Sequence, residues 1–181
     1  MPLPSLQTDR LLLRPYRLTD APDLVRLAGA REVAITTLRI PHPYRQEDAI
    51  EFIASFQAEA ELGTSARFAI TLRQNGELCG GIGLRIEKAH LHAELGYWIG
   101  VPYWGKGYAT EAARAAVHYG FETLGLRRIF ATCVTENPAS ARVLSKIGMQ
   151  HEGCQRSHIC KWGKFYDLDL YGMLIPDKTP A

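Results

Sequence analysis

The stretch Tyr-Trp-Ile-Gly-Val-Pro-Tyr-Trp-Gly-Lys-Gly-Tyr-Ala-Thr, residues 97–110, decides how the whole chain is interpreted. Its first residues are typical of a strand, and the alanine-rich residues after Gly107 are typical of a helix. Between the two, Gly105 and Gly107 allow backbone N–H groups to approach a ligand closely. The helix N-terminus adds unpaired N–H donors and a partial positive charge. The junction therefore predicts a site for an anion such as a phosphate.

Two other interpretations of this loop remain open. Residues 100–106 match the first seven positions of the nucleotide-binding pattern G-x-x-x-x-G-K-[ST], but Gly107 replaces the Ser or Thr that would hold Mg²⁺. The bulky Val-Pro-Tyr-Trp interior is also unlike a phosphate cradle. The second alternative is a structural turn before a core helix, because a lone Gly-x-Gly is a weak signal.

Around the junction, hydrophobic periodicity predicts strands and helices in mixed order. Asn75-Gly76 is a strong hairpin signal, and Asn137 followed by Pro138 is typical of a helix start. The expected strands cover residues 10–17, 67–73, 77–86, 90–99, 128–134, 149–154 and 165–174. The expected helices run from a cap at Thr19 or Asp20 to Ala28, and over 46–62, 109–124 and 137–147, with a loop over 36–44.

This order predicts an α/β (α+β) architecture with a mixed central sheet of about seven strands flanked by helices. The central run of three strands, two of them joined by the Asn75-Gly76 hairpin, excludes a plain dinucleotide-binding fold. On the helix over 46–62, the apolar face is expected to contain Ala49, Ile50, Ile53, Phe56 and Ala60.

Length and composition indicate a single domain over residues 1–181, with a packed core over about 8–175 and a frayed end over 176–181. A net charge of +2 argues against a dedicated nucleic-acid binder. No apolar run is long enough for a membrane span, and the first residues lack the pattern of a signal peptide, so we expect neither. The four cysteines have neither Cys-x-x-Cys nor zinc-ligand spacing. We therefore expect a cytoplasmic protein that binds no metal, no nucleic acid and no membrane.

Three segments together resemble one known family. Trp104 to Ala112, WGKGYATEA, resembles the acetyl-CoA signature [QR]-x-x-G-x-[GA] of the GNAT superfamily (Gcn5-related N-acetyltransferases), with Trp104 in place of Gln or Arg. TDRLLLRP at 8–15 and NPASARVLSKIGMQHEG at 137–153 resemble its RimJ/RimL branch, which includes ribosomal-protein N-terminal acetyltransferases. The resemblance implies the GNAT acyl-CoA N-acyltransferase fold, with acetyl-CoA as co-substrate and no metal.

The resemblance also implies where the cofactor lies. The strand before the loop would splay from its neighbour at a bulge, and the pantetheine arm would pair with the backbone of Ile99 and Val101. Asn137 would contact the pantetheine or a bound water, in addition to capping its helix. The pyrophosphate would be held by backbone N–H groups of Trp104, Gly105, Lys106, Gly107, Tyr108, Ala109 and Thr110.

The implied reaction is direct attack of a primary amine on the thioester. An α-amine titrates near ~8 and is mostly protonated at neutral pH, so a base helps to generate the free amine. Glu94 is the candidate base, with a salt-bridged surface carboxylate as the alternative and a water relay as a third possibility. In the RimL type a later glutamate is the base, but that position is Ile159 here. Family logic places the oxyanion donor at the N–H of Ile99.

Ser140 is the candidate acid that protonates the departing thiolate, because Asn-x-x-Ser resembles the RimL type; it is alternatively a simple helix-start residue. The leading acceptor is a protein α-amine, such as that of a ribosomal protein. The alternatives are a small-molecule amine (amino acid, polyamine or antibiotic) and, in another class, a non-catalytic acyl-CoA sensor. Both a monomer and a homodimer fit the sequence. The aromatic residues that could line an acceptor groove, or pack in the core, are Trp98, Tyr103, Trp162 and Tyr166.

Overall fold

The structure, a computed structural model, describes residues 3–175 and all their side chains except that of Gln57. The expected frayed end over 176–181 lies outside the described residues. Eight strands form one sheet in the order β1-β2-β3-β4-β5-β6-β8-β7, and of its pairs only β5 with β6 is parallel. The strands are β1 (Leu6–Gln7), β2 (Leu11–Arg14), β3 (Ser65–Leu72), β4 (Leu78–Glu87), β5 (His92–Ile99), β6 (Arg128–Val134), β7 (Gln150–Lys161) and β8 (Lys164–Leu174).

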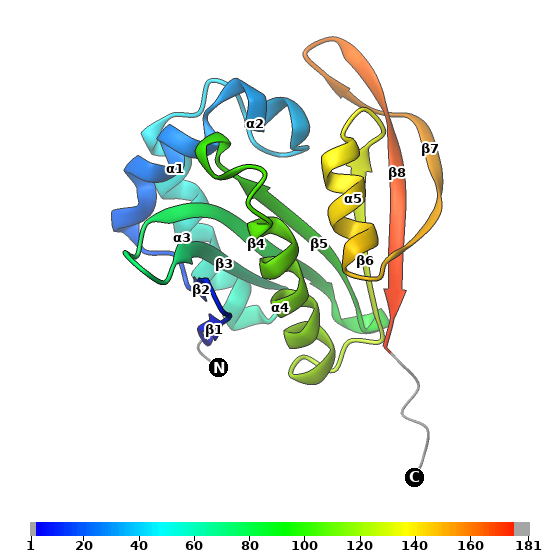
Figure 1. Ribbon diagram of the computed structural model, residues 1–181, viewed down its shortest axis with the longest axis horizontal. Helices are drawn as coiled ribbons and strands as arrows, with labels where there is room; N and C mark the ends of the chain where they lie inside the picture. Colours follow the sequence, from blue (N-terminus) through cyan, green and yellow to red (C-terminus); the bar gives the residue numbers. More distant parts are fainter. Residues whose placement is uncertain (1–2, 176–181) are drawn as a thin grey trace.

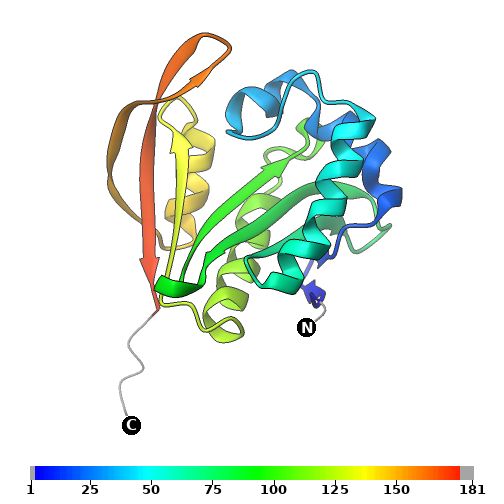
Figure 2. The same cartoon turned by 180° about the vertical axis from the view of Figure 1, so that it is seen from behind.

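Helices cover both faces of this sheet. The two helices α4 (Tyr108–Glu122) and α5 (Pro138–Lys146) lie on one face, as Figure 1 shows. Viewed from behind, α3 (Gln46–Leu62) crosses the opposite face, with α1 (Ala21–Ala28) beside it (Figure 2). The short helix α2 (Arg31–Thr36) follows α1 at one end of the sheet.

Two of the three apolar clusters of the described residues fill these layers. The larger lies between α4 and the sheet, where the small residues Ala112, Ala113 and Ala116 let the helix approach closely. The smaller lies beneath α1 and α3 and includes Leu24, Leu27, Val33, Ala49, Ile53 and Trp98. Strand alternation sends Leu95 to the α4 side and Trp98 to the α3 side. The two faces of β5 therefore contact separate environments.

Most expected elements are confirmed, and α3 and β6 have the predicted bounds. The mixed sheet is confirmed, with β1 as an eighth strand of only two residues. The helix α2 was not predicted, because six residues are too few for a periodic signal, and only its last residue, Thr36, falls within the loop expected over 36–44. The strand β7 runs to Lys161, seven residues past the prediction, because its polar second half forms a long exposed hairpin with β8.

Two details of the helix predictions are wrong. Ile50 is 42% exposed and does not join the buried face of α3, whereas Phe52 packs inward beside Ala49 and Ile53. Asp20 lies at the N-cap of α1 but makes no capping bond. Its carboxylate instead accepts two hydrogen bonds from Arg14, at 2.7 and 2.8 Å, because the nearly buried guanidinium needs a partner.

Within residues 3–175, every helix is too short or too polar to traverse a lipid bilayer.

Candidate functional site

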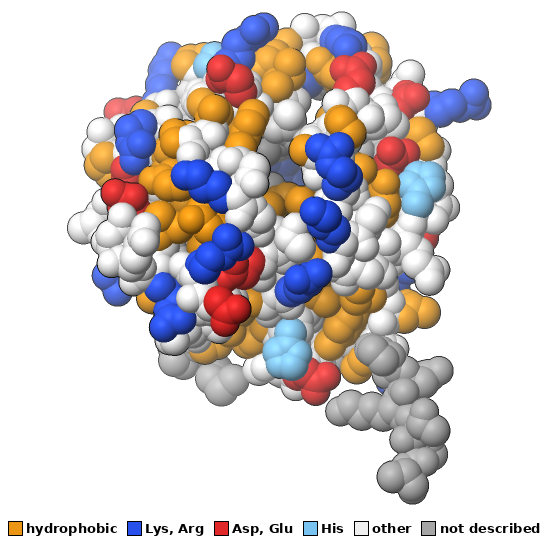
Figure 3. Space-filling view, in the orientation of Figure 1, with side chains coloured by type: hydrophobic (Ala, Val, Ile, Leu, Met, Phe, Trp, Pro, Cys, Tyr) orange, Lys and Arg blue, Asp and Glu red, His pale blue; other side chains and the backbone are white. Residues whose placement is uncertain are grey.

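The two parallel strands β5 and β6 separate along their length. They pair only at His92↔Arg128, Ala93↔Ile129 and Glu94↔Phe130. Beyond Glu94, β5 continues beside β4 to Ile99, while β6 continues beside β8. Figure 1 shows the widening space between the strands, and Figure 3 shows a hollow on the same face with Lys and Arg side chains on both sides. The sheet therefore opens beside the glycine loop that precedes α4.

The backbone of β5 presents hydrogen-bonding groups to this opening. Gly100 N–H donates to Cys79 O at 2.9 Å, and bonded pairs alternate with non-bonded pairs along an antiparallel ladder. The backbone groups of Tyr97 and Ile99 therefore face away from β4 and toward the opening. Such an edge can pair with an added extended chain.

Two features of this strand bear on the pantetheine contacts expected at Ile99 and Val101. Val101 is not part of the strand: it begins a 3-10 turn, Val101–Tyr103, because Gly100 and Pro102 interrupt regular pairing. The Val101 carbonyl accepts the N–H of Trp104 at 3.2 Å and is therefore used within the turn. Tyr97 and Ile99 are the residues whose backbone groups face the opening in strand geometry. The register between β4 and β5 also runs without a shift along the whole of β5, so the expected bulge is not in this pair.

The loop after β5 has the conformation of an anion site. Gly105 and Gly107 adopt φ of 75° and 79°, in the left-handed region that favours glycine. The helix α4 begins at Tyr108, and its first intrahelical bond runs from Glu111 N–H to Gly107 O at 3.1 Å. The N–H groups of Tyr108, Ala109 and Thr110 therefore precede the hydrogen-bonded part of the helix.

A clamp between distant residues fixes this loop. Glu111 accepts hydrogen bonds from the Thr8 hydroxyl at 2.7 Å and from Arg10, through its backbone N–H at 2.9 Å and its Nε at 2.7 Å. Arg10 also donates through Nη1 to the carbonyl of Lys106 at 2.9 Å. Burial alone would raise the pKa of Glu111, but these donors hold it below its ordinary value. The clamp holds one loop carbonyl against Arg10 and so orients the adjoining peptide units.

Trp104 joins the loop to the strand in a different way. Its indole Nε1 donates to Ile99 O at 2.6 Å, while 46% of the residue remains exposed. The Trp104 side chain thus donates to the carbonyl of Ile99, while the N–H of Ile99 stays directed to the opening. Lys106 lies with its Nζ 5.5 Å from the centre of the Tyr103 ring.

Ser140 lies across the opening from β5. The side chain of Asn137 accepts the Ser140 N–H at 3.1 Å, which confirms the predicted cap of α5. The Ser140 hydroxyl is 2.8 Å from the hydroxyl of Tyr97, which lies on β5. Burial raises the pKa of Tyr97 and keeps its phenol protonated, whereas the hydrogen bond to Ser140 acts in the opposite direction. This hydroxyl pair connects the two walls of the opening.

Glu94 lies on the opposite face of β5, toward α3. Its Oε2 accepts hydrogen bonds from Arg39 at 2.8 Å and from Arg85 at 2.6 Å. Burial by itself would raise the pKa of Glu94, but the two guanidiniums outweigh burial and lower it. The carboxylate is therefore ion-paired, and a lowered pKa makes it a weaker base than an isolated glutamate. The RimL-type base position, Ile159, packs beside Val134, Tyr166 and Leu168.

The four aromatic residues expected near an acceptor occupy different places. Trp98 is 9% exposed and packs in the cluster beneath α1 and α3. Tyr103 lies beside Glu77, with its hydroxyl 3.5 Å from the carboxylate. Tyr166 is buried in the cluster with Val134. Trp162 is at the tip of the β7–β8 hairpin, where its ring is 5.8 Å from that of His42. The structure therefore does not bring these four together.

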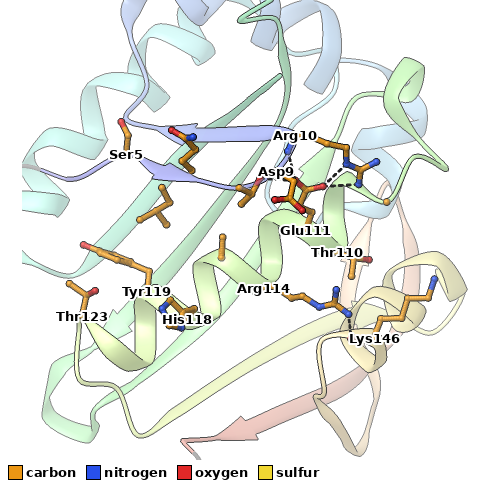
Figure 4. A pocket seen from close by; sticks show the side chains of 15 residues that line it. Ser5, Asp9, Arg10, Thr110, Glu111, Arg114, His118, Tyr119, Thr123 and Lys146 are labelled. Atoms are coloured by element: carbon orange, nitrogen blue, oxygen red, sulfur yellow. Dashed lines mark hydrogen bonds and ion pairs between the residues drawn. The ribbon is translucent and has the colours of Figure 1, made fainter. Parts of the chain in front are cut away.

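A depression of about 1140 Å³ runs along α4 between the first strands and the end of α5 (Figure 4). It includes the start of α4 at Gly107 and Thr110, and the cations Arg10, Arg114 and Lys146. Arg114 donates to the Lys146 carbonyl at 3.0 Å and so joins α4 to α5. The depression meets the loop at one end, while the Tyr97–Ser140 pair lies outside it.

Sequence reasoning missed the residues that support the site. Thr8, Arg10 and Glu111 fell within the motifs used for the family resemblance, but the residues that the clamp joins are 101 and 103 positions apart. No spacing rule reports such a contact. Tyr97 was also missed, although strand alternation places it on the face opposite Glu94.

Known proteins match most of this chain. Residues 10–150 match the family described as an acetyltransferase (GNAT) domain. The N-acetyltransferase YoaA of Bacillus subtilis (strain 168), which is itself uncharacterized, is 36% identical over 96% of this chain and 98% of its own length. The [ribosomal protein uS5]-alanine N-acetyltransferase of Escherichia coli (strain K12) is 29% identical over 100% of this chain and 96% of its own. A GNAT-family acetyltransferase from Bacillus anthracis superposes with a TM-score of 0.84 at 29% identity, over 94% of this chain and 98% of that one.

Proposed function

The chain belongs to the GNAT acetyltransferase family and is an N-acetyltransferase, and on this premise we propose that it transfers the acetyl group of acetyl-CoA to a primary amine by direct attack. The observation that carries the proposal is the separation of β5 from β6 beside a glycine loop with unpaired N–H groups. Relatives named N-acetyltransferases favour an enzyme over a non-catalytic sensor on the same fold.

The cofactor fits this site by the hydrogen-bonding groups that the site offers. We infer that the N–H groups from Gly105 to Thr110 hold the pyrophosphate, where the helix dipole also favours negative charge, whereas the N–H of Trp104 is bonded to the Val101 carbonyl. The pantetheine arm has amide groups that complement the backbone of Tyr97 and Ile99 in the opening. Its thiol end would then lie near the Tyr97–Ser140 pair. Asn137 holds Ser140 in place through the cap of α5.

The proposed chemistry uses few side chains. The amine nitrogen bonds to the thioester carbon, and a β5 backbone N–H that the pantetheine arm leaves unpaired, at Tyr97 or Ile99, stabilises the negative charge that develops on the carbonyl oxygen. The C–S bond then breaks, and the thiolate accepts a proton from the Ser140 hydroxyl. Tyr97 lies 2.8 Å from that hydroxyl and can return a proton to it. The products are the acetylated amine and free coenzyme A.

The amine loses its proton by one of two routes. Glu94 is on the face of β5 toward α3, which we propose as the acceptor face, but two guanidiniums lower its pKa. A water relay requires no dedicated base, and it suits an α-amine with a pKa of about 8, part of which is neutral at physiological pH. The lowered pKa of Glu94 favours the water route.

Two classes of acceptor remain. A protein α-amine is supported by relatives such as the uS5-alanine acetyltransferase, at 29% identity. A small-molecule amine is supported by contacts that close one end of the acceptor face. There, Lys161 of the β7–β8 hairpin donates to carbonyls of Ala34, Thr37 and Ile40. These bonds hold the hairpin against the connection after α2, which leaves less room for a large acceptor at this end of the face.

The test is thiol release from acetyl-CoA across a panel of amines and N-terminal peptides. We expect release that depends on the amine and a matching acetylated product by mass spectrometry. Ser140→Ala should lower kcat by about 10²-fold, the usual size of an acid contribution. Tight binding of acetyl-CoA without release on any acceptor would contradict the proposal.

A further inference from the structure

On the face of β5 that we propose for the acceptor, one position has no side chain, and we call the surface there the floor of the acceptor site. Gly96 lies in the middle of the strand, is exposed, and has no atom within 4 Å of the place where a Cβ would be. The residue that pairs with Gly96 on β4 is also a glycine, Gly83. The aliphatic part of the Arg67 side chain lies over Gly83. Glu94 and Trp98 share this face with Gly96, because strand residues alternate. A space next to the end of the β5–β6 pairing is therefore left for a ligand rather than filled by a side chain.

Two arginines from different segments meet at the edge of this floor. Arg39, from the connection after α2, and Arg85, from β4, both donate through Nη2 to the same oxygen of Glu94. Their side chains remain 61% and 58% exposed, while that of Glu94 is only 13% exposed. A guanidinium has five N–H donors, and each of these bonds uses one of them. Both arginines therefore retain donors for a second anion.

The charges around the floor leave an excess of positive charge. Arg67 pairs with Glu59 at 2.9 Å, and burial, together with the charges of Arg39 and Arg85, lowers its pKa. The three guanidiniums are thus compensated by two carboxylates. Lys161, whose Nζ donates to backbone carbonyls on both sides of Arg39, is a further cation beside this segment.

We propose that the space above Gly96 is the acceptor site and that it selects primary amines carrying an anionic group, a carboxylate or a phosphate. The anionic group would bind the Arg39–Arg85 pair, and the amine would lie over Gly96, facing the end of the opening where the thioester is proposed to sit. This inference rests on the proposed function and specifies its substrate class.

The same geometry disfavours the other acceptor chemistries. A polyamine would bring its second positive charge against two guanidiniums, while the carboxylate that could bind it is already paired. A neutral amine would leave the free donors of Arg39 and Arg85 with water alone. An N-terminal peptide fits only where an acidic group lies close to its α-amine.

The experiment compares small primary amines that differ in charge: alanine and alaninamide, which are matched in size, then ethylamine and putrescine, with an aminoalkyl phosphate as a second anionic amine. Rates of thiol release are expressed per concentration of unprotonated amine, because the pKa values of these amines differ. We expect kcat/KM for the anionic amines to exceed that for the others by about 10-fold or more, as for charge-assisted hydrogen bonds to one group. Alanine and the phosphate together show which anion fits better.

Substitutions test whether the preference for anionic amines depends on Arg85 and Gly96. Arg85→Met should reduce the ratio of anionic to neutral rates by about 10-fold, whereas Arg26→Met, in an exposed pair on α1, should leave the ratio unchanged. Gly96→Val should raise KM for every acceptor without weakening acetyl-CoA binding, because it fills the floor in ordinary strand backbone. Circular dichroism and thermal melting establish that each variant is folded.

The outcomes separate this inference from the function on which it rests. Equal or better rates with neutral amines or putrescine would overturn the inference and leave the acetyltransferase proposal intact. A preference for anionic amines that survives in Arg85→Met and in Arg39→Met would also overturn it. Absence of thiol release with every amine would instead overturn the proposed function.

Discussion

At the scale of single residues, Gly107 carries the cofactor proposal most directly. Its φ of 79° is strained for any L side chain by roughly 1–2 kcal/mol, and a Cβ there would also stand at the start of α4. We expect Gly107→Val to raise the dissociation constant of acetyl-CoA by at least about 10-fold, measured by isothermal titration calorimetry. The matched control is Gly76→Val, with φ of 76° in a hairpin turn. Equal weakening in both variants would mean a general loss of stability.

Glu94 allows a second test at this scale. Because its pKa is lowered, the carboxylate stays ionised throughout the neutral range and has little tendency to accept a proton. We expect Glu94→Gln to leave the shape of the pH profile of kcat/KM unchanged and to reduce activity by less than about 10²-fold. If the loss were instead steepest at lower pH, where free amine is scarce, Glu94 would be the base and the water relay would be wrong.

At the scale of elements, β2 and α1 are joined by the Arg14–Asp20 ion pair. The side chains are 12% and 8% exposed, and Asp20 also accepts the backbone N–H of Arg17 at 2.8 Å. Burial alone would raise the pKa of Asp20, but these donors hold it below its ordinary value. The stabilisation is therefore present above the unfolded-state pKa, about 3.9, and is lost as the pH falls through the lower folded-state pKa.

Asp20→Asn should therefore destabilise the fold by about 3 kcal/mol at pH 7, because it leaves a nearly buried guanidinium without its charge partner. Urea denaturation at several pH values measures the difference, which should shrink as the pH falls below about 4. The control is Asp23→Asn, in an exposed pair with Arg26, which should cost less than about 1 kcal/mol. A difference that stayed constant with pH would show that the ionised carboxylate is not the source of the stability.

The sequence predicted elements well where local signals are strong. The helix α3 has regular periodicity and ends at Gly63, which adopts φ of 64°, so its bounds match. The glycine loop and the cap at Asn137 are also local signals, and both lie where expected. The clamp of Glu111 by Thr8 and Arg10, and the pairing of Glu94 with Arg39, arise only when distant segments pack. The catalytic roles of Glu94 and Ser140 remain predictions.

At the scale of the whole molecule, the β7–β8 hairpin reaches from the α5 side of the opening to the α2 side (Figure 1). Lys161 bonds to backbone carbonyls of Ala34, Thr37 and Ile40, and burial lowers its pKa. The side chain of Leu38 packs against the cluster of Val134, Tyr166 and Leu168. These contacts join the part of the molecule on the β5 side of the opening to the part on the β6 side. They lie at the end of the opening away from the paired residues of β5 and β6.

Lys161→Met should therefore speed hydrogen exchange in residues 31–42 and 157–164, while exchange in β3 and β4 stays unchanged. The reason is that the hairpin and the connection after α2 lose their shared cation but retain the apolar contacts of Leu38. The matched control is Lys164→Met, whose Nζ pairs with the exposed Glu136 at 2.9 Å. Identical exchange in both variants would mean that Lys161 does not hold the two halves together.

The central claim is that acetyl-CoA lies in the opening between β5 and β6, with its pyrophosphate on the loop before α4. Amide hydrogen exchange measured residue by residue by NMR, with and without acetyl-CoA, tests it most directly. We predict slowed exchange at the N–H groups of Tyr97 and Ile99 and along residues 104–110. Saturating acetyl-CoA that left Tyr97 and Ile99 unchanged, and protected only residues lining the depression along α4, would contradict it.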